Sequence, residues 1–160
     1  MARSKAIRVK GIQDVQRGLK NLGLTARNSR TEINKALRPA ANLLARGMQR
    51  AYKKEFNRFE GTRKQGRTPT WRTIGITTAK KSREPGLFVG PMKKRTTPIK
   101  VKGKDSYNLA EMQILGNVRQ QPRKNIFEAT ANQMESIIYV RVEKDLDRLL
   151  EKMIKKSGLR

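Results

Sequence analysis

Residues 33–52 read INKALRPAANLLARGMQRAY, and their apolar side chains recur every three or four positions. This spacing is typical of one face of an α-helix. The predicted buried face comprises Ile33, Leu37, Ala40, Ala41, Leu44, Met48 and Tyr52. The intervening polar residues, Lys35, Arg38, Asn42, Arg46, Gln49 and Arg50, are expected to point outward. The stretch therefore predicts a long amphipathic helix against which the rest of the chain packs.

Two local signals bear on the limits of this helix. Ser29 and Glu32 have the spacing of a capping box, in which both side chains accept hydrogen bonds from free backbone N–H groups at a helix start. We expect a helix of roughly 25 residues to follow. Pro39 interrupts the pattern, because proline removes a backbone hydrogen bond and crowds the carbonyl four residues earlier, at a cost of about 3 kcal/mol. We expect a kink near Lys35 to Pro39, and the alternative is two helices that meet there.

A shorter helix is predicted before this one. Ile12, Val15, Leu19 and Leu22 lie on one helix face, and Gly23 is suited to end it.

A long helix is predicted at the C-terminal end. Asn125 and Glu128 repeat the spacing of a capping box. The predicted apolar stripe comprises Val142, Leu146, Leu149, Leu150, Met153 and Ile154, and the predicted outward residues are Arg141, Lys144, Asp145, Arg148, Lys152 and Lys155. The β-branched residues of 137–142 favour a strand by propensity alone, but the stripe that continues beyond them favours a helix.

The middle of the chain has a different composition. Residues 53–104 hold sixteen Lys and Arg but only three acidic residues, a net charge of +13. Gly and Pro residues separate β-like runs at 70–78, 87–90 and 97–102. Residues 107–115 fit a strand or a helical turn, and we favour the strand. This composition predicts a small antiparallel sheet with long basic loops.

These elements together predict an α+β fold in one domain. It would comprise an N-terminal arm or strand (residues 1–10), helices (11–56), a basic sheet with its loops (57–124) and the C-terminal helix (125–157). The sheet would be packed by the long helix and the C-terminal helix.

The charge of the whole chain limits its function. With 38 Lys and Arg against 13 Asp and Glu, the formal net charge is +25 over 160 residues. A compact state this far from neutral repels itself unless anions lie beside it, and nucleic acid is the first candidate. The chain contains no His and no Cys, which excludes Ser-His and Cys-His nucleophiles and the usual zinc sites. We predict no enzyme activity, no metal and no cofactor.

The location of the protein is predicted from further absences in the sequence. Without Cys there is no disulfide framework, which is compatible with a reducing cytosol. The first ten residues lack the apolar run of a signal peptide, and no stretch approaches the roughly 18 apolar residues of a membrane span. We expect no membrane association.

Residues in five parts of the chain carry a resemblance. They are Ile7, Val9, Gly11, Val15, Leu19 and Leu22; Ala36, Leu37, Ala40 and Ala41; Leu87, Phe88, Val89, Gly90 and Pro91; Ala110, Glu111, Leu115 and Gly116; and Gln121 with Pro122. In order and spacing, the chain resembles the tail-completion, or neck-zone minor tail, family of long-tailed bacteriophages. It departs from the family pattern at residues 70–73, after Pro122, where the usual Phe is missing, and in its very basic middle.

The resemblance implies a virion structural protein at the junction between the DNA-filled head and the tail, present in the host cytoplasm during assembly. Such a subunit forms a homo-oligomeric ring, a hexamer in this family, contacts neighbouring neck and tail proteins, and has no catalytic role. The interface candidates are Trp71, Phe88, Glu111, Arg119 and Pro122. For Trp71 and Phe88 we favour anchoring in a core or an interface over base stacking.

A ring around double-stranded DNA needs a lumen that does not repel phosphate, and non-specific Lys and Arg contacts are sufficient for that. The lining candidates are Lys80, Lys81, Arg83, Lys93, Lys94, Arg95, Lys100, Lys102 and Lys104. A charge run is by default a solvated surface, or it pairs with an acidic neighbouring protein.

Two further functions stay open. Charge alone also fits a general RNA- or DNA-binding protein, such as a ribosome-associated or chromatin-like factor. A metal-dependent nuclease would need converging carboxylates, and Asp145 with Asp147 is the nearest pair in the sequence. Residues two apart in a helix point to different sides, so we expect these two to be surface charges balanced by Arg141, Lys144 and Arg148.

Overall fold

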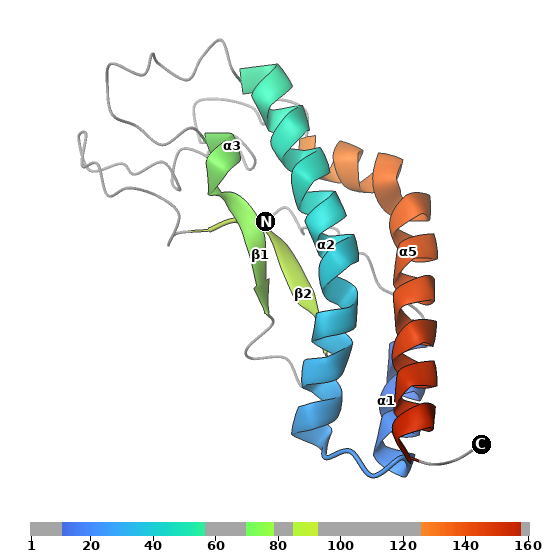
Figure 1. Cartoon of the computed structure of the whole chain (residues 1–160). Coiled ribbons are helices and arrows are strands. Elements are labelled where there is room, and N and C mark those ends of the chain that lie inside the picture. Colours follow the sequence, from blue (N-terminus) through green and yellow to red (C-terminus); the bar gives the residue numbers. More distant parts are fainter. Residues whose placement is uncertain (1–10, 57–69, 79–84, 93–125, 158–160) are drawn as a thin grey trace. The chain divides into compact units, whose positions relative to one another are not determined.

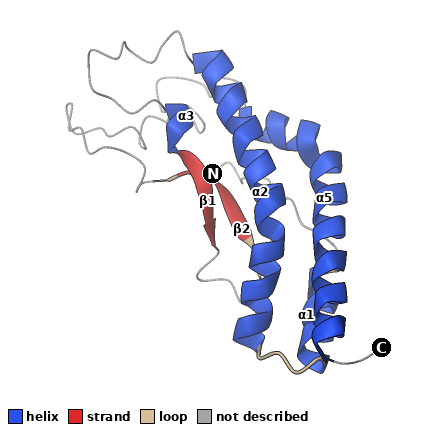
Figure 2. Cartoon of the chain, in the orientation of Figure 1, coloured by secondary structure: helices blue, strands red, loops and turns tan. Residues whose placement is uncertain are grey.

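The computed structural model describes residues 11–56, 70–78, 85–92 and 126–157. The elements are α1 (Ile12–Asn21), α2 (Ala26–Phe56), α3 (Thr70–Thr73), β1 (Ile74–Thr78), β2 (Leu87–Pro91) and α5 (Ile126–Ser157) (Figure 1). The two strands pair as a small antiparallel sheet (Figure 2). Long helices with such a sheet confirm the predicted α+β class. No helix within the described ranges is long and apolar enough to cross a membrane.

The first helix ends as its sequence predicts. Gly23 has a φ of +85°, a conformation that glycine adopts without strain. The Leu24 N–H donates to the Leu19 carbonyl at 3.1 Å, and the Gly23 N–H donates to the Lys20 carbonyl at 2.9 Å. These two hydrogen bonds form a Schellman motif, which satisfies carbonyls that the helix end leaves free. The chain can therefore turn sharply from α1 into α2.

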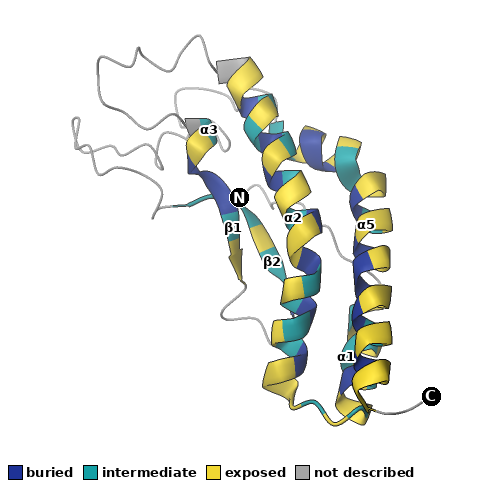
Figure 3. Cartoon of the chain, viewed as in Figure 1, coloured by how far each residue is buried: buried dark blue, intermediate teal, exposed yellow. Residues whose placement is uncertain are grey.

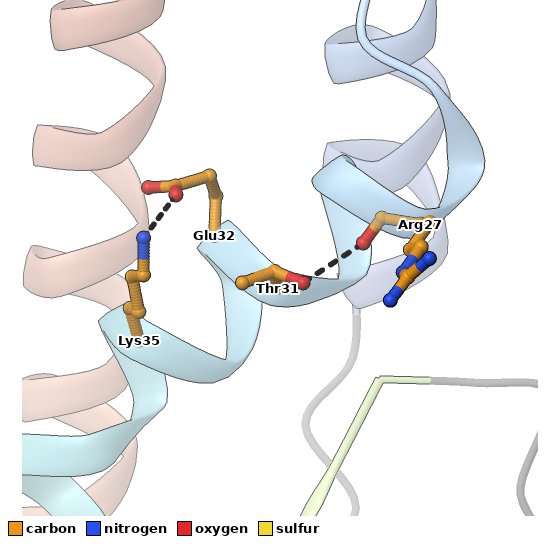
Figure 4. Close-up of polar contacts among 4 residues, drawn as sticks. All are labelled: Arg27, Thr31, Glu32 and Lys35. Carbon is orange, nitrogen blue, oxygen red and sulfur yellow. Dashed lines mark hydrogen bonds and ion pairs between the residues drawn. The ribbon is translucent and has the colours of Figure 1, made fainter.

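The predicted start of α2 is wrong by one turn. The helix begins at Ala26, and Thr25 caps it, because the Asn28 N–H donates to Thr25 Oγ1 at 3.3 Å. Ser29 lies inside the helix, where its hydroxyl donates to the Thr25 carbonyl at 2.9 Å. Glu32 accepts from Lys35 Nζ at 2.6 Å instead of reaching back to the helix start (Figure 4). Thr25 has a hydroxyl group, as Ser29 does, and lies one turn earlier. Either residue could cap the helix, so the spacing of Ser29 and Glu32 did not identify the true start.

Pro39 does not divide the helix. It lies inside the 31-residue α2, so the alternative of two helices is wrong, and the kink stays a prediction. Pro39 is exposed, as is Lys35, whose carbonyl loses its helical donor. Water can satisfy a carbonyl on that side, which makes the proline tolerable there.

The next segment differs in part from its prediction. Residues 70–73 form the short helix α3, so the strand predicted from residue 70 starts only at Ile74. The strand predicted over residues 87–90 is confirmed as β2. The runs at 97–102 and 107–115 and the arm at 1–10 lie outside the described residues.

The described residues group into two compact units. The Trp71 unit comprises residues 44–56, 70–76, 89–92 and 126–134, and the Leu19 unit comprises 11–43, 77–78, 85–88 and 135–157. The chain passes from one unit to the other within α2, within both strands and within α5. The prediction of one domain stays a prediction.

Each unit has its own buried apolar side chains, most of which belong to the two long helices (Figure 3). In the Leu19 unit they are Leu19, Ile33, Leu37, Ala40, Ile138, Val142, Leu146, Leu149 and Met153. In the Trp71 unit they are Ala45, Met48, Tyr52, Ile74 and Ala131. Most of the two predicted helix faces is therefore confirmed. Ile154 is 43% exposed, so its place in the buried stripe of α5 is wrong.

Residues 137–142 are helical, as the continuing stripe predicted. Asp145 was expected on the outer face of α5 but is only 9% exposed. Arg141 Nε donates to its carboxylate at 2.8 Å, and Arg148 lies 3.9 Å away. A carboxylate tolerates burial when cations hold it in this way, and the partners expected for it at 141 and 148 are correct.

Candidate nucleic-acid interface

Most of the predicted site residues lie outside the described parts of the chain. The nine lining candidates, Lys80, Lys81, Arg83, Lys93, Lys94, Arg95, Lys100, Lys102 and Lys104, lie outside the described residues. The interface candidates Glu111, Arg119 and Pro122 do as well. Trp71 and Phe88 are described, and they have different surroundings.

Phe88 lies in β2 with 61% of its surface exposed. Anchoring in the core is therefore wrong for this side chain within the single chain. The alternating directions of side chains along a strand place it on the opposite face from Leu87 and Val89, which are both half-buried. Its role in a subunit interface stays a prediction.

Trp71 lies in α3 and is half-buried, and two cations lie close to its ring. Lys53 Nζ is 5.4 Å from the centroid of its ring system, and Arg72 Cζ is 5.1 Å from it. Both distances fall within the range of about 6 Å for an attractive cation–π interaction. Lys53 comes from the last turn of α2, whereas Arg72 follows Trp71 in α3. We call Trp71, Lys53 and Arg72 the indole cluster.

The backbone around the indole cluster is held from two sides. Gln49 Nε2, on α2, donates to the Ile74 carbonyl at 2.9 Å and so ties the start of β1 to the helix. The Met92 N–H donates to the Thr73 carbonyl at 2.9 Å, which ties the end of α3 to the end of β2. Thr73 and Ile74 are fully buried. Trp71 therefore lies two residues before Thr73, whose backbone is buried and hydrogen-bonded.

Lys53 is anchored through its neighbour in the chain. Tyr52 is 2% exposed, and its ring meets that of Phe127 edge to face, with centroids 5.4 Å apart. Burial raises the pKa of the Tyr52 hydroxyl well above its usual value, because the charged phenolate would lose its hydration. Tyr52 therefore stays neutral and acts as an apolar anchor.

The ion pairs between described residues lie in the other unit. They join Arg17 to Asp14, Lys35 to Glu32, and both Arg141 and Arg148 to Asp145. None of them involves Lys53 or Arg72, and both of these side chains are exposed. The indole cluster thus presents positive charge that no described carboxylate neutralises.

The geometry gives no support to a nuclease centre. Asp145 is buried against Arg141, whereas Asp147 is exposed, so the two carboxylates point to different sides of α5. Among the residues with a described position, no three of the types His, Cys, Asp and Glu come together as metal ligands.

The sequence carries only a partial signal for the indole cluster. Trp71 and Arg72 are adjacent, but Lys53 comes from another element, and its sequence context marks it only as part of a basic stretch. The pattern that could have indicated the cluster is a basic last turn of a predicted helix that precedes the only tryptophan in the sequence. Comparison of the chain with protein-family models, curated proteins and solved structures gives no match.

Proposed function

We propose that this chain is a structural protein of the head-tail junction of a long-tailed bacteriophage. In this role it completes the tail, assembles into a homo-oligomeric ring around the DNA channel and joins tail to head. The observation that carries the proposal is the order of its elements, in which a short and a long helix precede a small sheet in a basic part of the sequence, and a long terminal helix follows. The α+β arrangement of the described residues agrees with the fold that the family resemblance implies.

The distribution of charge supports a place around DNA. Outside the described residues the sequence holds twenty-one Lys and Arg against four acidic residues, which is +17 of the total +25. The nine lining candidates belong to this part of the chain. In a ring, subunits would bring several copies of these segments together, and only an anion with dense charge, such as duplex DNA, would offset their repulsion.

A general nucleic-acid-binding protein is the second candidate. The indole cluster favours it specifically, because cations beside an aromatic ring suit contact with any nucleic acid and require no ring of subunits. This alternative predicts a monomer or dimer whose affinity for DNA or RNA falls steeply with salt. The two functions therefore differ in their assembly state, and only the general binder requires nucleic-acid binding.

Light scattering on the nuclease-treated protein in moderate salt distinguishes the two. The mass would be measured for the protein alone and after mixing with purified phage tails or heads. A ring-sized oligomer, formed alone or only on the particle, supports the head-tail junction. A monomer that ignores the particles but binds duplex DNA or RNA at low salt leaves the general binder.

The role of Phe88 can be tested in the same experiment. Phe88→Ala is expected to weaken the oligomer, because an exposed aromatic side chain is a typical interface anchor. Val140→Ala is the matched control, since Val140 is 66% exposed and is not an interface candidate. Equal oligomer masses for the two variants would remove Phe88 from the interface.

A further inference from the structure

The indole cluster combines three kinds of hydrogen-bond donor in three neighbouring side chains. An ammonium or guanidinium group that lies over a ring keeps N–H groups that can donate elsewhere. The indole adds its own N–H as a donor, and Trp71 is half-buried, so part of its surface meets solvent. The cluster therefore offers donors and positive charge together, and it contains no acceptor side chain.

The ring also limits the freedom of the two cations. A free Lys or Arg side chain loses much of its rotamer entropy when a ligand fixes it. Contact with a common ring restricts Lys53 and Arg72 before any ligand arrives. The hydrogen bonds of Gln49 and Met92 hold the backbone beneath them. Ligand binding then carries a smaller entropic cost.

We propose that the indole cluster is a contact site for a phosphate group of duplex DNA, made by Lys53 and Arg72 with Trp71 as their common support. This inference rests on the proposed function for its ligand and adds a site outside the predicted lining residues. A phosphodiester fits better than a protein carboxylate. Guanidinium and ammonium groups both bind phosphate oxygens, and the sugar beside each phosphate also offers surface to the aromatic ring.

Trp71 is the only tryptophan of the chain, so its fluorescence reports on this site without any substitution. The full-length, nuclease-treated protein would be titrated with a short fluorescently labelled duplex, and both Trp71 emission and duplex anisotropy would be followed. We expect the two signals to change with the same midpoint. Anisotropy that rises while Trp71 emission stays constant would show that DNA binds elsewhere, which overturns the site and leaves the head-tail proposal intact.

The salt dependence identifies the phosphate-binding cations. Each phosphate that a protein neutralises adds about 0.9 to the slope of log K against log salt, so Lys53→Gln with Arg72→Gln, which removes the contact to one phosphate, should reduce the slope by about 0.9. Arg38→Gln with Lys152→Gln removes the same two residue types from exposed positions of the Leu19 unit and should leave the slope near that of the wild type. Equal slopes for the two double variants would contradict the proposal.

Poly-glutamate tests the competing ligand chemistry. It should change Trp71 emission only at much higher concentration of negative charge than duplex DNA requires. A response at the same charge concentration would assign the site to an acidic protein partner and overturn the phosphate assignment. A ring that assembles on phage particles without any binding of duplex DNA would also overturn it, while leaving the head-tail function standing.

Discussion

The two units deal with positive charge in different ways. In the Leu19 unit, Arg141 and Arg148 hold the buried carboxylate of Asp145. In the Trp71 unit, Lys53 and Arg72 lie beside an aromatic ring and no described carboxylate pairs with them. An ion pair at a buried acid contributes to folding, whereas a cation on a ring keeps its charge and donors for a partner. The cations of the Leu19 unit that pair with Asp145 therefore stabilise the fold, whereas those of the indole cluster keep donors that a ligand can bind.

The largest expected effect is on the aromatic anchor of the Trp71 unit. Tyr52→Ala should lower the free energy of unfolding by about 3–5 kcal/mol, because it deletes a buried ring and its packing against Phe127. Urea unfolding followed by Trp71 emission measures the change beside the site itself. Tyr52→Phe is the control, since it keeps the ring, and should lose less than about 1.5 kcal/mol. A small loss in Tyr52→Ala would mean that the unit does not depend on this anchor.

Two helical glycines extend the comparison to packing. A Cβ added at Gly47 would overlap Met134 Sδ and approach Thr130, whereas one added at Gly18 in α1 would meet nothing. Gly47→Leu should therefore destabilise the protein by about 1–3 kcal/mol. Gly18→Ala should stabilise it by about 0.5–1 kcal/mol through helix propensity. Thermal unfolding followed by circular dichroism measures both, and stabilisation by Gly47→Leu would contradict a close helix approach at that position.

Removing one cation from each unit tests whether cations contribute differently to stability in the two units. Arg141→Gln takes the shorter of two ion pairs from buried Asp145 and should cost about 1–3 kcal/mol. Arg50→Gln removes an exposed cation of the Trp71 unit and should change stability by less than about 0.5 kcal/mol. Equal losses in urea unfolding would show that the cation paired with buried Asp145 contributes no more to the fold than an exposed cation of the Trp71 unit.

The helices were largely predictable because their signals are local. Periodicity predicted the buried faces of α2 and α5, and Gly23 ended α1 as expected. The start of α2 was missed because Thr25 and Ser29 both have oxygen side chains that can cap a helix, and only the backbone shows which one does. At residues 70–73, β propensity gave way to a helical turn that connects into β1.

The candidate site was less predictable because it depends on contacts between separate elements. The distance in sequence between Lys53 and Trp71 gives no sign that their side chains meet. The burial of Asp145 was missed for a similar reason, since an acid beside several cations normally indicates a solvated surface. Local patterns identified the residue types, and tertiary packing decided which of them are paired.

The smallest expected effect comes from inorganic phosphate, which probes the cations of the indole cluster without DNA. Phosphate that binds only the folded protein stabilises it by about 0.4 kcal/mol when its concentration equals its Kd. The melting temperature in phosphate should therefore exceed that in chloride at equal ionic strength. Phosphate also stabilises proteins generally through its exclusion from their surface, so the difference between variants carries the test. Lys53→Gln with Arg72→Gln should lose part of the increment, and Arg38→Gln with Lys152→Gln should keep all of it. Identical increments in the two double variants would mean that the indole cluster attracts phosphate no better than isolated surface cations do.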